Sequence, residues 1–330
     1  MLCRGLSVVL ALVLASAPLQ ADEPAGKKPA DGFVPLYNGD DLSGWEVLDG
    51  KLEAWQADGE VLSCVAEGGG WLRTKKQYSD FILKLEFRIP AGGNSGVGLR
   101  LPPEGPPHEA GMEIQILDDD ADQHKDLKPA QYSGSIYYQV AAKRGFARPP
   151  GEWNTYEITC RGPLVKVILN GETVTEASLD KSTEGEGGHR ALADRPEIGA
   201  IGLQSHGSKV EFRNVAVKDL TSATKSGVAF VDVVEGRGLA VPPGATVTVH
   251  YTGRLTNGKK FDSSRDRTQP ATFPLSNVIR GWQDGIPGMK VGGRRKLVIP
   301  ARLAYGEAGR PPVIPGNSIL IFDVEVLEIR

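Results

Sequence analysis

The sequence has no excess of charge of either sign. Its 38 lysine and arginine residues nearly balance 41 aspartate and glutamate residues, and the formal net charge is -3. Such a chain produces no basic field that would attract nucleic acid or an anionic membrane. Aromatic residues are also sparse, at 7% of the chain, whereas glycine occurs 41 times. This combination weakly favours β-structure that is rich in turns.

Long hydrophobic runs are missing beyond the N-terminus, so no transmembrane span is predicted. The one early run, Leu6–Leu14, follows Arg4 and precedes small residues that end at Ala21. It is shorter than the roughly 20 residues that cross a membrane. This order is typical of a secretory signal peptide. We predict cleavage after residue 21 and export to the periplasm or the extracellular space; a retained anchor or a buried strand is the alternative.

Cysteine is scarce, with 3 residues in the whole chain. Cys3 would leave with the signal peptide, and Cys64 and Cys160 would remain. Export permits a disulfide bond between them. One pair does not define a framework, and two buried thiols fit the apolar stretches around them equally well. Their pairing stays open.

Motifs for metals and cofactors are absent as well. The acidic run from Asp118 resembles the start of a calcium loop, but Gln123 and Pro129 stand where the helix–loop–helix form needs glycine and glutamate. Residues 92–98 are glycine-rich without linking a strand to a helix, which argues against a dinucleotide site. His108, His124 and His189 lack the spacing of paired ligands and are interpreted as surface residues. We predict no metal and no cofactor.

Apolar and polar residues alternate in several parts of the sequence. A length of 330 residues suggests about two domains, and polar segments at 22–32 and 221–227 are predicted to be linkers. Residues 81–89 alternate between apolar and mostly charged side chains, as in a strand with one buried face. Val165, Val167 and Leu169 repeat this before Asn170-Gly171, a hairpin signal. For residues 33–220 we therefore predict a β-jelly-roll sandwich.

The remaining segment, residues 228–330, also begins and ends with alternating strands. One short helix is predicted between Ser276 and Met289. An antiparallel sheet wrapped on one helix is an α+β fold, so the whole chain is predicted to be mainly β, in two domains.

Ordered motifs cover almost all of this C-terminal segment. They are 249–253 (VHYTG), 258–264 (GKKFDSS), 278–282 (VIRGW), 288–292 (GMKVG), 303–306 (LAYG), 314–315 (IP) and 320–325 (LIFDVE). In this order they resemble the peptidyl-prolyl cis-trans isomerases of the FK506-binding-protein (FKBP) type. The resemblance implies binding of proline-containing polypeptides and inhibition by FK506-like macrolides.

The resemblance also implies a site. An aromatic pocket holds the proline ring, and donors hold the carbonyl oxygens of the substrate. By resemblance, Trp282 is the floor, the Ile279 N–H and the Tyr305 hydroxyl are donors, and Asp262 supplies polarity. The expected catalytic residues are Tyr251, Phe261, Asp262, Val278, Ile279, Trp282, Tyr305 and Phe322. Without the ordered motifs these aromatic residues would be assigned to the core.

Two positions depart from the pattern. Ala271 stands where many relatives carry an aromatic residue, which would loosen one wall. Arg310 lies in the short loop 307–312, which is expected to overhang the pocket. A cation there would favour acidic peptides; we interpret it instead as a solvated loop charge.

The N-terminal segment carries a second set of motifs. They are 33–45 (FVPLYNGDDLSGW), 94–100 (NSGVGLR), 113–118 (EIQILD), 134–137 (GSIY), 151–154 (GEWN), 202–207 (GLQSHG) and 212–215 (FRNV). They resemble a secreted bacterial family described as 3-keto-disaccharide (3-keto-glycoside) hydrolases, with a concanavalin-like or laminin-G-like jelly roll. The resemblance implies a carbohydrate ligand.

Polar residues on strand faces are the candidates for this second site. Arg100 is expected to lie on the same strand face as Gly96 and Gly98. Glu113 is expected to share a strand face with Gln115, and His206 to share one with Gln204. Glu113 or His206 would be the general base and Arg100 would polarise the ketone. The expected sugar site contains Asn94, Arg100, Glu113, Gln115, Asp118, Tyr137, Gln204 and His206. The alternative is an ordinary solvated sheet face.

Three functional hypotheses follow. In the first, both domains are enzymes. In the second, a carbohydrate-binding module carries an exported prolyl isomerase. In the third, the isomerase pocket only binds proline-containing partners, without catalysis.

Overall fold

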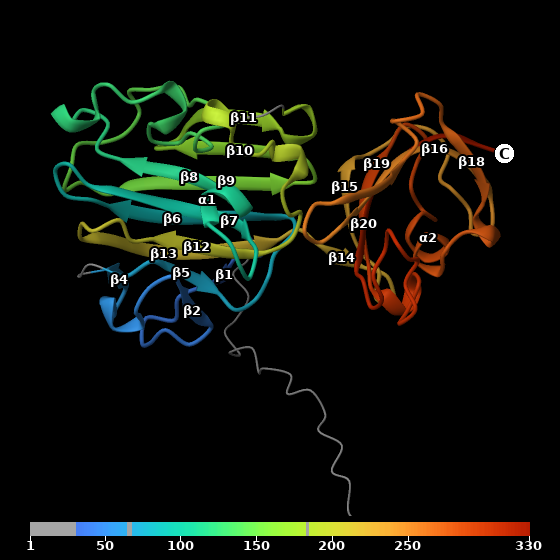
Figure 1. The fold of residues 1–330 in the computed structure, drawn as a ribbon, viewed down its shortest axis with the longest axis horizontal. Helices are drawn as coiled ribbons and strands as arrows, with labels where there is room; N and C mark the ends of the chain where they lie inside the picture. Colours follow the sequence, from blue (N-terminus) through green and yellow to red (C-terminus); the bar gives the residue numbers. More distant parts are fainter. Residues whose placement is uncertain (1–30, 65–67, 183–184) are drawn as a thin grey trace, which may run out of the picture.

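The structure, a computed structural model, describes residues 31–64, 68–182 and 185–330. The predicted signal peptide and Cys3 lie outside these residues. The chain forms two domains that consist mainly of β-strands and lie side by side (Figure 1), which confirms the predicted fold class. None of the helices in the described part is both long and apolar enough to cross a membrane.

The N-terminal domain is a sandwich of two antiparallel sheets. The larger sheet contains, in spatial order, β11 (Glu172–Ser178), β10 (Leu164–Leu169), β9 (Asn154–Arg161), β6 (Phe81–Arg88), β13 (Val210–Asp219), β4 (Val61–Cys64) and β3 (Trp55–Asp58), with β1 (Val34–Pro35) paired to β13. The smaller sheet contains β2 (Trp45–Leu48), β5 (Trp71–Thr74), β12 (Ala200–Gln204), β7 (Asn94–Leu101) and β8 (Met112–Leu117).

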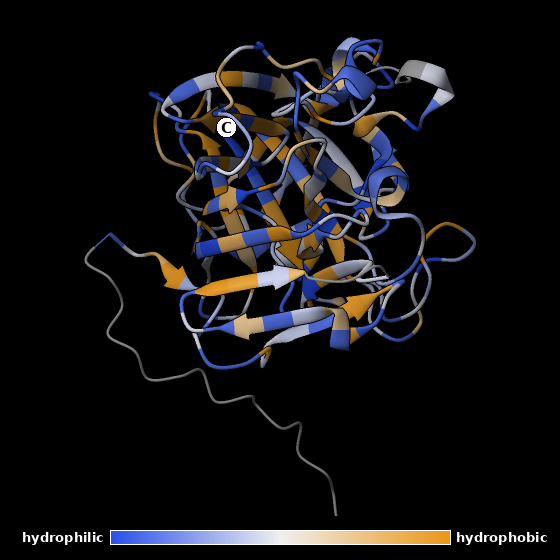
Figure 2. Cartoon of the chain, turned by 90° about the vertical axis from the view of Figure 1, so that its left-hand side faces the viewer, coloured by the Kyte–Doolittle hydropathy of each residue, from blue (hydrophilic) through white to orange (hydrophobic). Residues whose placement is uncertain are grey.

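Alternation places the core between these sheets. In β6, Phe81, Leu83, Leu85 and Phe87 are buried while the residues between them are more exposed. Figure 2 shows the same alternation of hydrophobic and hydrophilic residues along strands. Cys64 and Cys160 are both buried here and are not joined by a disulfide bond. Burial raises the pKa of the Cys160 thiol to about 11, so this thiol stays protonated at neutral pH.

The C-terminal domain is one antiparallel sheet with a short helix on one face. The strands are β14 (Ser222–Ala223), β15 (Ala229–Val234), β19 (Arg294–Ile299), β20 (Leu320–Ile329), β16 (Thr246–Leu255) and β17 (Lys260–Ser263), with β18 (Ala271–Pro274) paired to β16. The helix is α2 (Arg280–Gly285), inside the predicted interval. Segment 221–227, predicted as a linker, instead contributes β14 to this sheet, because Ser222 and Ala223 pair with β15.

The other regular elements are short. They are α1 (Pro107–Ala110) and the 3-10 turns η1 (Leu52–Ala54), η2 (Asp122–His124), η3 (Pro129–Gln131), η4 (Leu179–Lys181), η5 (Glu186–Gly188), η6 (Leu192–Asp194), η7 (Leu275–Asn277) and η8 (Ala301–Leu303).

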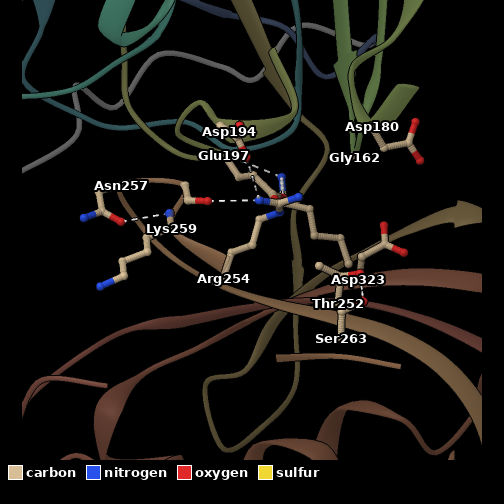
Figure 3. A network of polar contacts seen from close by, with 12 residues as sticks. Gly162, Asp180, Asp194, Glu197, Thr252, Arg254, Asn257, Lys259, Ser263 and Asp323 are labelled. Atoms are coloured by element: carbon tan, nitrogen blue, oxygen red, sulfur yellow. Dashed lines mark hydrogen bonds and ion pairs between the residues drawn. The ribbon is translucent and has the colours of Figure 1, made fainter. Parts of the chain in front are cut away.

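The second face of the C-terminal sheet packs on the N-terminal domain through charged side chains. Lys296 of β19 is 1% exposed, and its Nζ lies 2.9 Å from Oδ2 of Asp80, which is also 1% exposed. Figure 3 shows Arg254 of β16 directed at Glu197 and Asp194 of the other domain, at 3.7 and 3.8 Å. The two domains are thus joined by one buried ion pair and by more exposed ones, as well as by the chain.

Candidate functional site

A cavity of about 650 Å³ lies on the helix side of the C-terminal sheet. Its lining contains all eight residues that the sequence predicted for this site. It also contains six that were not in that set, namely Phe273, Asn277, Arg310, Pro311, Val313 and Ile314. The structure therefore brings the predicted proline-site residues together around one space.

Aromatic rings form the bottom of the cavity. Trp282, at the first turn of α2, is 4% exposed. The rings of Tyr251 and Phe322 each meet it edge-on with centroids 5.3 Å apart, and that of Phe273 does so at 5.9 Å. Edge-on packing is a favoured arrangement for aromatic pairs. The result is an apolar floor of fixed shape.

Strand alternation and one glycine make room for these rings. On β16, Tyr251 and Gly253 face the cavity, whereas Arg254 faces the other domain. A Cβ atom on Gly253 would lie 2.6 Å from the ring of Phe261 and 2.8 Å from that of Phe322. Only glycine at this position lets the two rings approach the strand so closely.

The polar edge of the cavity is a linked group of three side chains. The Tyr251 hydroxyl donates a hydrogen bond to Asp262, and the Arg267 guanidinium donates to both, at 2.7 Å from Asp262 Oδ1 and 3.0 Å from the Tyr251 oxygen. Partial burial opposes ionisation of Asp262, but the Tyr251 hydroxyl and then Arg267 hold its pKa below the usual value. Burial, followed by the hydrogen bond to Asp262, raises the pKa of Tyr251. Asp262 is thus ionised, and the charge of Arg267 balances its own.

Several donors at the cavity, including the buried Trp282 indole N–H, have no hydrogen-bond partner among the described residues. Among the described residues, neither the Ile279 N–H nor the Tyr305 hydroxyl has a hydrogen-bond partner. Ile279 precedes the first turn of α2, where N–H groups have no intrahelical acceptor. Both donors are available to carbonyl oxygens of a ligand.

Sequence reasoning missed Phe273 and Arg267 at this site. Phe273 could have been found, because it alternates with Ala271 on β18 and so shares its side of the strand. Arg267 has no such signal, since it lies in the turn after β17 and reaches Asp262 only through the fold.

The N-terminal candidate site centres on Glu113 of β8. This side chain lies opposite Gly98 in the pairing of β7 with β8 and is 2% exposed. A Cβ atom on Gly96 would lie 2.3 Å from Glu113 Oε1, so the glycine provides the space for the carboxyl group. Burial raises the pKa of Glu113 to about 8, against a smaller opposing effect of its hydrogen bond with Gln204. Glu113 is therefore largely protonated at neutral pH.

Other predicted sugar-site residues lie near Glu113. Gln115 donates to Asn94 Oδ1 at 2.9 Å on the same sheet. Burial raises the pKa of Tyr137 to about 12, with a smaller contribution from the charge of Glu113. Asn94, Glu113, Gln115, Tyr137 and Gln204 are thus brought together.

Arg100 is not part of this group, which corrects our expectation. Its φ is +52°, and the register of β7 against β12 shifts at this point. Leu101, rather than Arg100, lies over Gly98 and Gly202. This bulge reverses the expected alternation. Arg100 is buried instead near the other domain, where it donates to the Ser79 oxygen at 2.7 Å and lies 3.7 Å from Asp80.

Asp118 and His206 are also placed elsewhere. Asp118 Oδ2 accepts a hydrogen bond from the Gly92 N–H at 2.7 Å and fixes a turn. His206 is exposed, because β12 ends at Gln204 and the alternating phase does not continue to it.

Aromatic residues and histidines that were assigned to surface loops lie next to Tyr137. The Tyr137 ring lies 4.4 Å from that of Tyr138, which stacks on His189 at 4.3 Å, and His108 lies 6.2 Å from Tyr137. These contacts come from three separate loops, so no sequence spacing reveals them. Within the described residues, no group of three or more histidine, cysteine, aspartate or glutamate side chains is arranged to hold a metal ion.

The chain belongs to two families: residues 32–218 match the 3-keto-alpha-glucoside-1,2-lyase-like domain, and residues 239–327 match the FKBP-type peptidyl-prolyl cis-trans isomerases. Both family assignments made from the motifs are confirmed.

Individual relatives match parts of the chain. An FK506-binding protein from Neisseria meningitidis serogroup B is 50% identical over 105 residues, which are 31% of this chain and 96% of that protein. The isomerase FkpA from Aeromonas hydrophila is 46% identical over 143 residues, 43% of this chain, and the match spans 51% of that relative's length. A solved structure of a proposed glycosyl hydrolase from Parabacteroides distasonis is 32% identical, with a TM-score of 0.52, covering 57% of this chain and 99% of that one.

Proposed function

We propose that the C-terminal domain catalyses cis-trans isomerisation of X-Pro peptide bonds in exported polypeptides. The observation that carries this is the cavity, with a buried aromatic floor and the unpartnered Ile279 N–H and Tyr305 hydroxyl donors. Rotation about an X-Pro bond has a barrier of about 18–20 kcal/mol because amide resonance is lost in the twisted state. The twisted amide is less polar than the planar one. An apolar pocket that binds it more tightly lowers the barrier without a covalent step.

The residues that line the cavity have separate roles in this reaction. The proline ring sits on Trp282 between Tyr251 and Phe322. The Ile279 N–H and the Tyr305 hydroxyl donate to substrate carbonyl oxygens and hold the flanking chain while the amide rotates. Asp262, kept ionised by Tyr251 and Arg267, orients the Tyr251 ring.

The test is a protease-coupled isomerisation assay on the full chain. We expect acceleration that FK506-like macrolides block. Tyr305→Phe should lower kcat/KM about tenfold, the equivalent of one hydrogen bond of about 1.4 kcal/mol in the transition state. Asp262→Ala should also lower it, whereas Asp126→Ala, an exposed position on the other domain, should not. A folded protein that binds the macrolide without acceleration would be a proline-binding module instead.

We also propose that the N-terminal domain acts on 3-keto-glycosides, with Glu113 as the general base. A ketone at C3 acidifies the proton on C2. Glu113 takes this proton, the electron pair forms the C1–C2 double bond, and the glycosidic C1–O bond breaks. The leaving oxygen then receives the proton. With a pKa of about 8, Glu113 accepts the proton in its ionised form, which is the minor form at pH 7 and increases as the pH rises, and then donates it in its protonated form.

Access of a sugar to Glu113 requires movement of the groups that cover it, because this residue is 2% exposed. The test follows a 3-keto-glucoside in D₂O by mass spectrometry. Elimination predicts release of the aglycone. Glu113→Gln should abolish this release, whereas Glu211→Gln should not, since Glu211 is a partly exposed residue of β13 in the other sheet, paired with Arg88. Binding without turnover by the parent protein would identify a carbohydrate-binding module.

A further inference from the structure

The loop that overhangs the proline cavity holds Arg310 in a defined place. The Arg310 N–H donates to the Ile314 oxygen at 2.8 Å, and the Ile314 N–H donates back at 3.0 Å. Gly309 before it has φ of +63°, and a Cβ atom there would lie 2.4 Å from the Ile314 oxygen. Closely packed backbone on both sides therefore fixes the point from which the Arg310 side chain leaves. The Arg310 side chain is exposed, as interpreted from the sequence, and it also lines the cavity.

The charge of Arg310 is not balanced within the chain. Its guanidinium carbon lies 5.9 Å from the centroid of the Tyr305 ring, and no ion pair between described residues includes Arg310. The other charged residue in the cavity lining, Asp262, is 2.7 Å from Arg267 and neutralised by it. The lining therefore presents a net positive charge to a bound peptide.

We propose that Arg310 makes this pocket select prolyl peptides with an acidic side chain directly before proline. The inference rests on the proposed isomerase function and deepens it. With the proline ring on Trp282, the preceding residue extends toward the rim, because one residue advances the chain by about 3.3–3.6 Å. A carboxylate there meets an arginine that has no competing acid. The aromatic floor is unchanged by this preference, so neutral peptides remain substrates.

The experiment compares peptides that differ only in Glu-Pro against Gln-Pro, using the full chain in the protease-coupled assay. Glutamine matches glutamate in shape and lacks its charge. We expect a kcat/KM ratio of Glu-Pro to Gln-Pro about threefold above one, in line with a partly exposed ion pair. Arg310→Gln should bring the ratio to about one, and Arg310→Glu should invert it. High salt should lower the wild-type ratio by screening.

Arg302→Gln is the matched control. Arg302 is an exposed arginine of the same domain whose guanidinium donates to the Ser226 oxygen and does not line the cavity. Its ratio should equal that of the wild type. An equal rate on both peptides for the wild type and Arg310→Glu would overturn the inference while leaving the isomerase intact. No acceleration of either peptide by the wild type would instead overturn the isomerase function itself.

Discussion

Replacing Lys296 with methionine tests whether the ion pair between the domains determines stability. Methionine keeps the length and apolar stem of lysine but removes the charge. Asp80 would then retain only Arg100 at 3.7 Å as a cationic partner, while staying 1% exposed. Removing one member of a buried pair costs about 3–5 kcal/mol, because the remaining charge is buried without compensation.

The pKa of Asp80 gives an independent magnitude. Burial alone would raise it, but Lys296 and then Arg100 lower it from 3.8 to about 2. At about 1.36 kcal/mol per pKa unit, this lowering corresponds to about 2.4 kcal/mol for Lys296, Arg100, Ser79 and Gly162 together, net of the cost of burial. Both figures lead us to expect that Lys296→Met lowers the free energy of unfolding by about 2–4 kcal/mol. Urea titration followed by circular dichroism measures it.

The pH dependence of the stability loss distinguishes loss of the ion pair from a packing defect. A carboxylate with a lowered pKa in the folded state stabilises the protein above its unfolded pKa, and that contribution is lost as the pH falls through the folded value. The difference between wild type and Lys296→Met should be complete above about pH 4 and shrink toward pH 2. The control Lys290→Met removes an exposed pair with Glu235 and should leave the free energy of unfolding almost unchanged, because exposed pairs contribute little. A loss of under 1 kcal/mol for Lys296→Met, constant with pH, would refute the reasoning.

Two further predictions concern buried or crowded positions. Burial raises the pKa of Glu113 from 4.5 to about 8, so its contribution to stability is complete below pH 4.5 and is lost as the pH rises through 8. Urea titrations at pH 5, 6.5 and 8 should show this decline in the free energy of unfolding, and Glu113→Gln should flatten it. Parallel declines in the wild type and the variant would contradict the assignment. Gly258→Ala should lower the melting temperature, because Gly258 has φ of +84° and a Cβ atom there would lie 2.3 Å from the Asp194 oxygen of the other domain. Gly244→Ala is the control: Gly244 has φ of +76° and open space around it, so this variant shows the backbone cost alone, about 1 kcal/mol. Equal effects of the two substitutions would mean that the domains separate easily.

Most of the proline cavity could be predicted from the sequence because its residues follow the rules of strand alternation and lie in ordered motifs. Tyr251, Trp282 and Phe322 come from three elements whose order along the chain is characteristic. The same reasoning failed at Arg100, since alternation assumes an unbroken period of two and the bulge in β7 breaks it. A bulge at a single residue leaves no signal in composition.

The contact between the domains was not predictable for a different reason. Lys296 follows Arg294 and Arg295 on β19 and looks like an ordinary solvent-facing lysine. Only docking of the two sheets buries it against Asp80. Charged residues of this kind are almost always exposed, so alternation alone assigns them to the surface.

The docking of segment 221–227 into the C-terminal sheet has a geometric consequence for ligands. Flexibly tethered modules reach a range of separations, and their joint affinity depends on linker length. Here β14 and the Lys296–Asp80 pair set the proline cavity and the Glu113 face at one fixed distance and direction. Under the two proposed functions, a polymer that engages both sites must therefore present sugar and proline at one matching spacing.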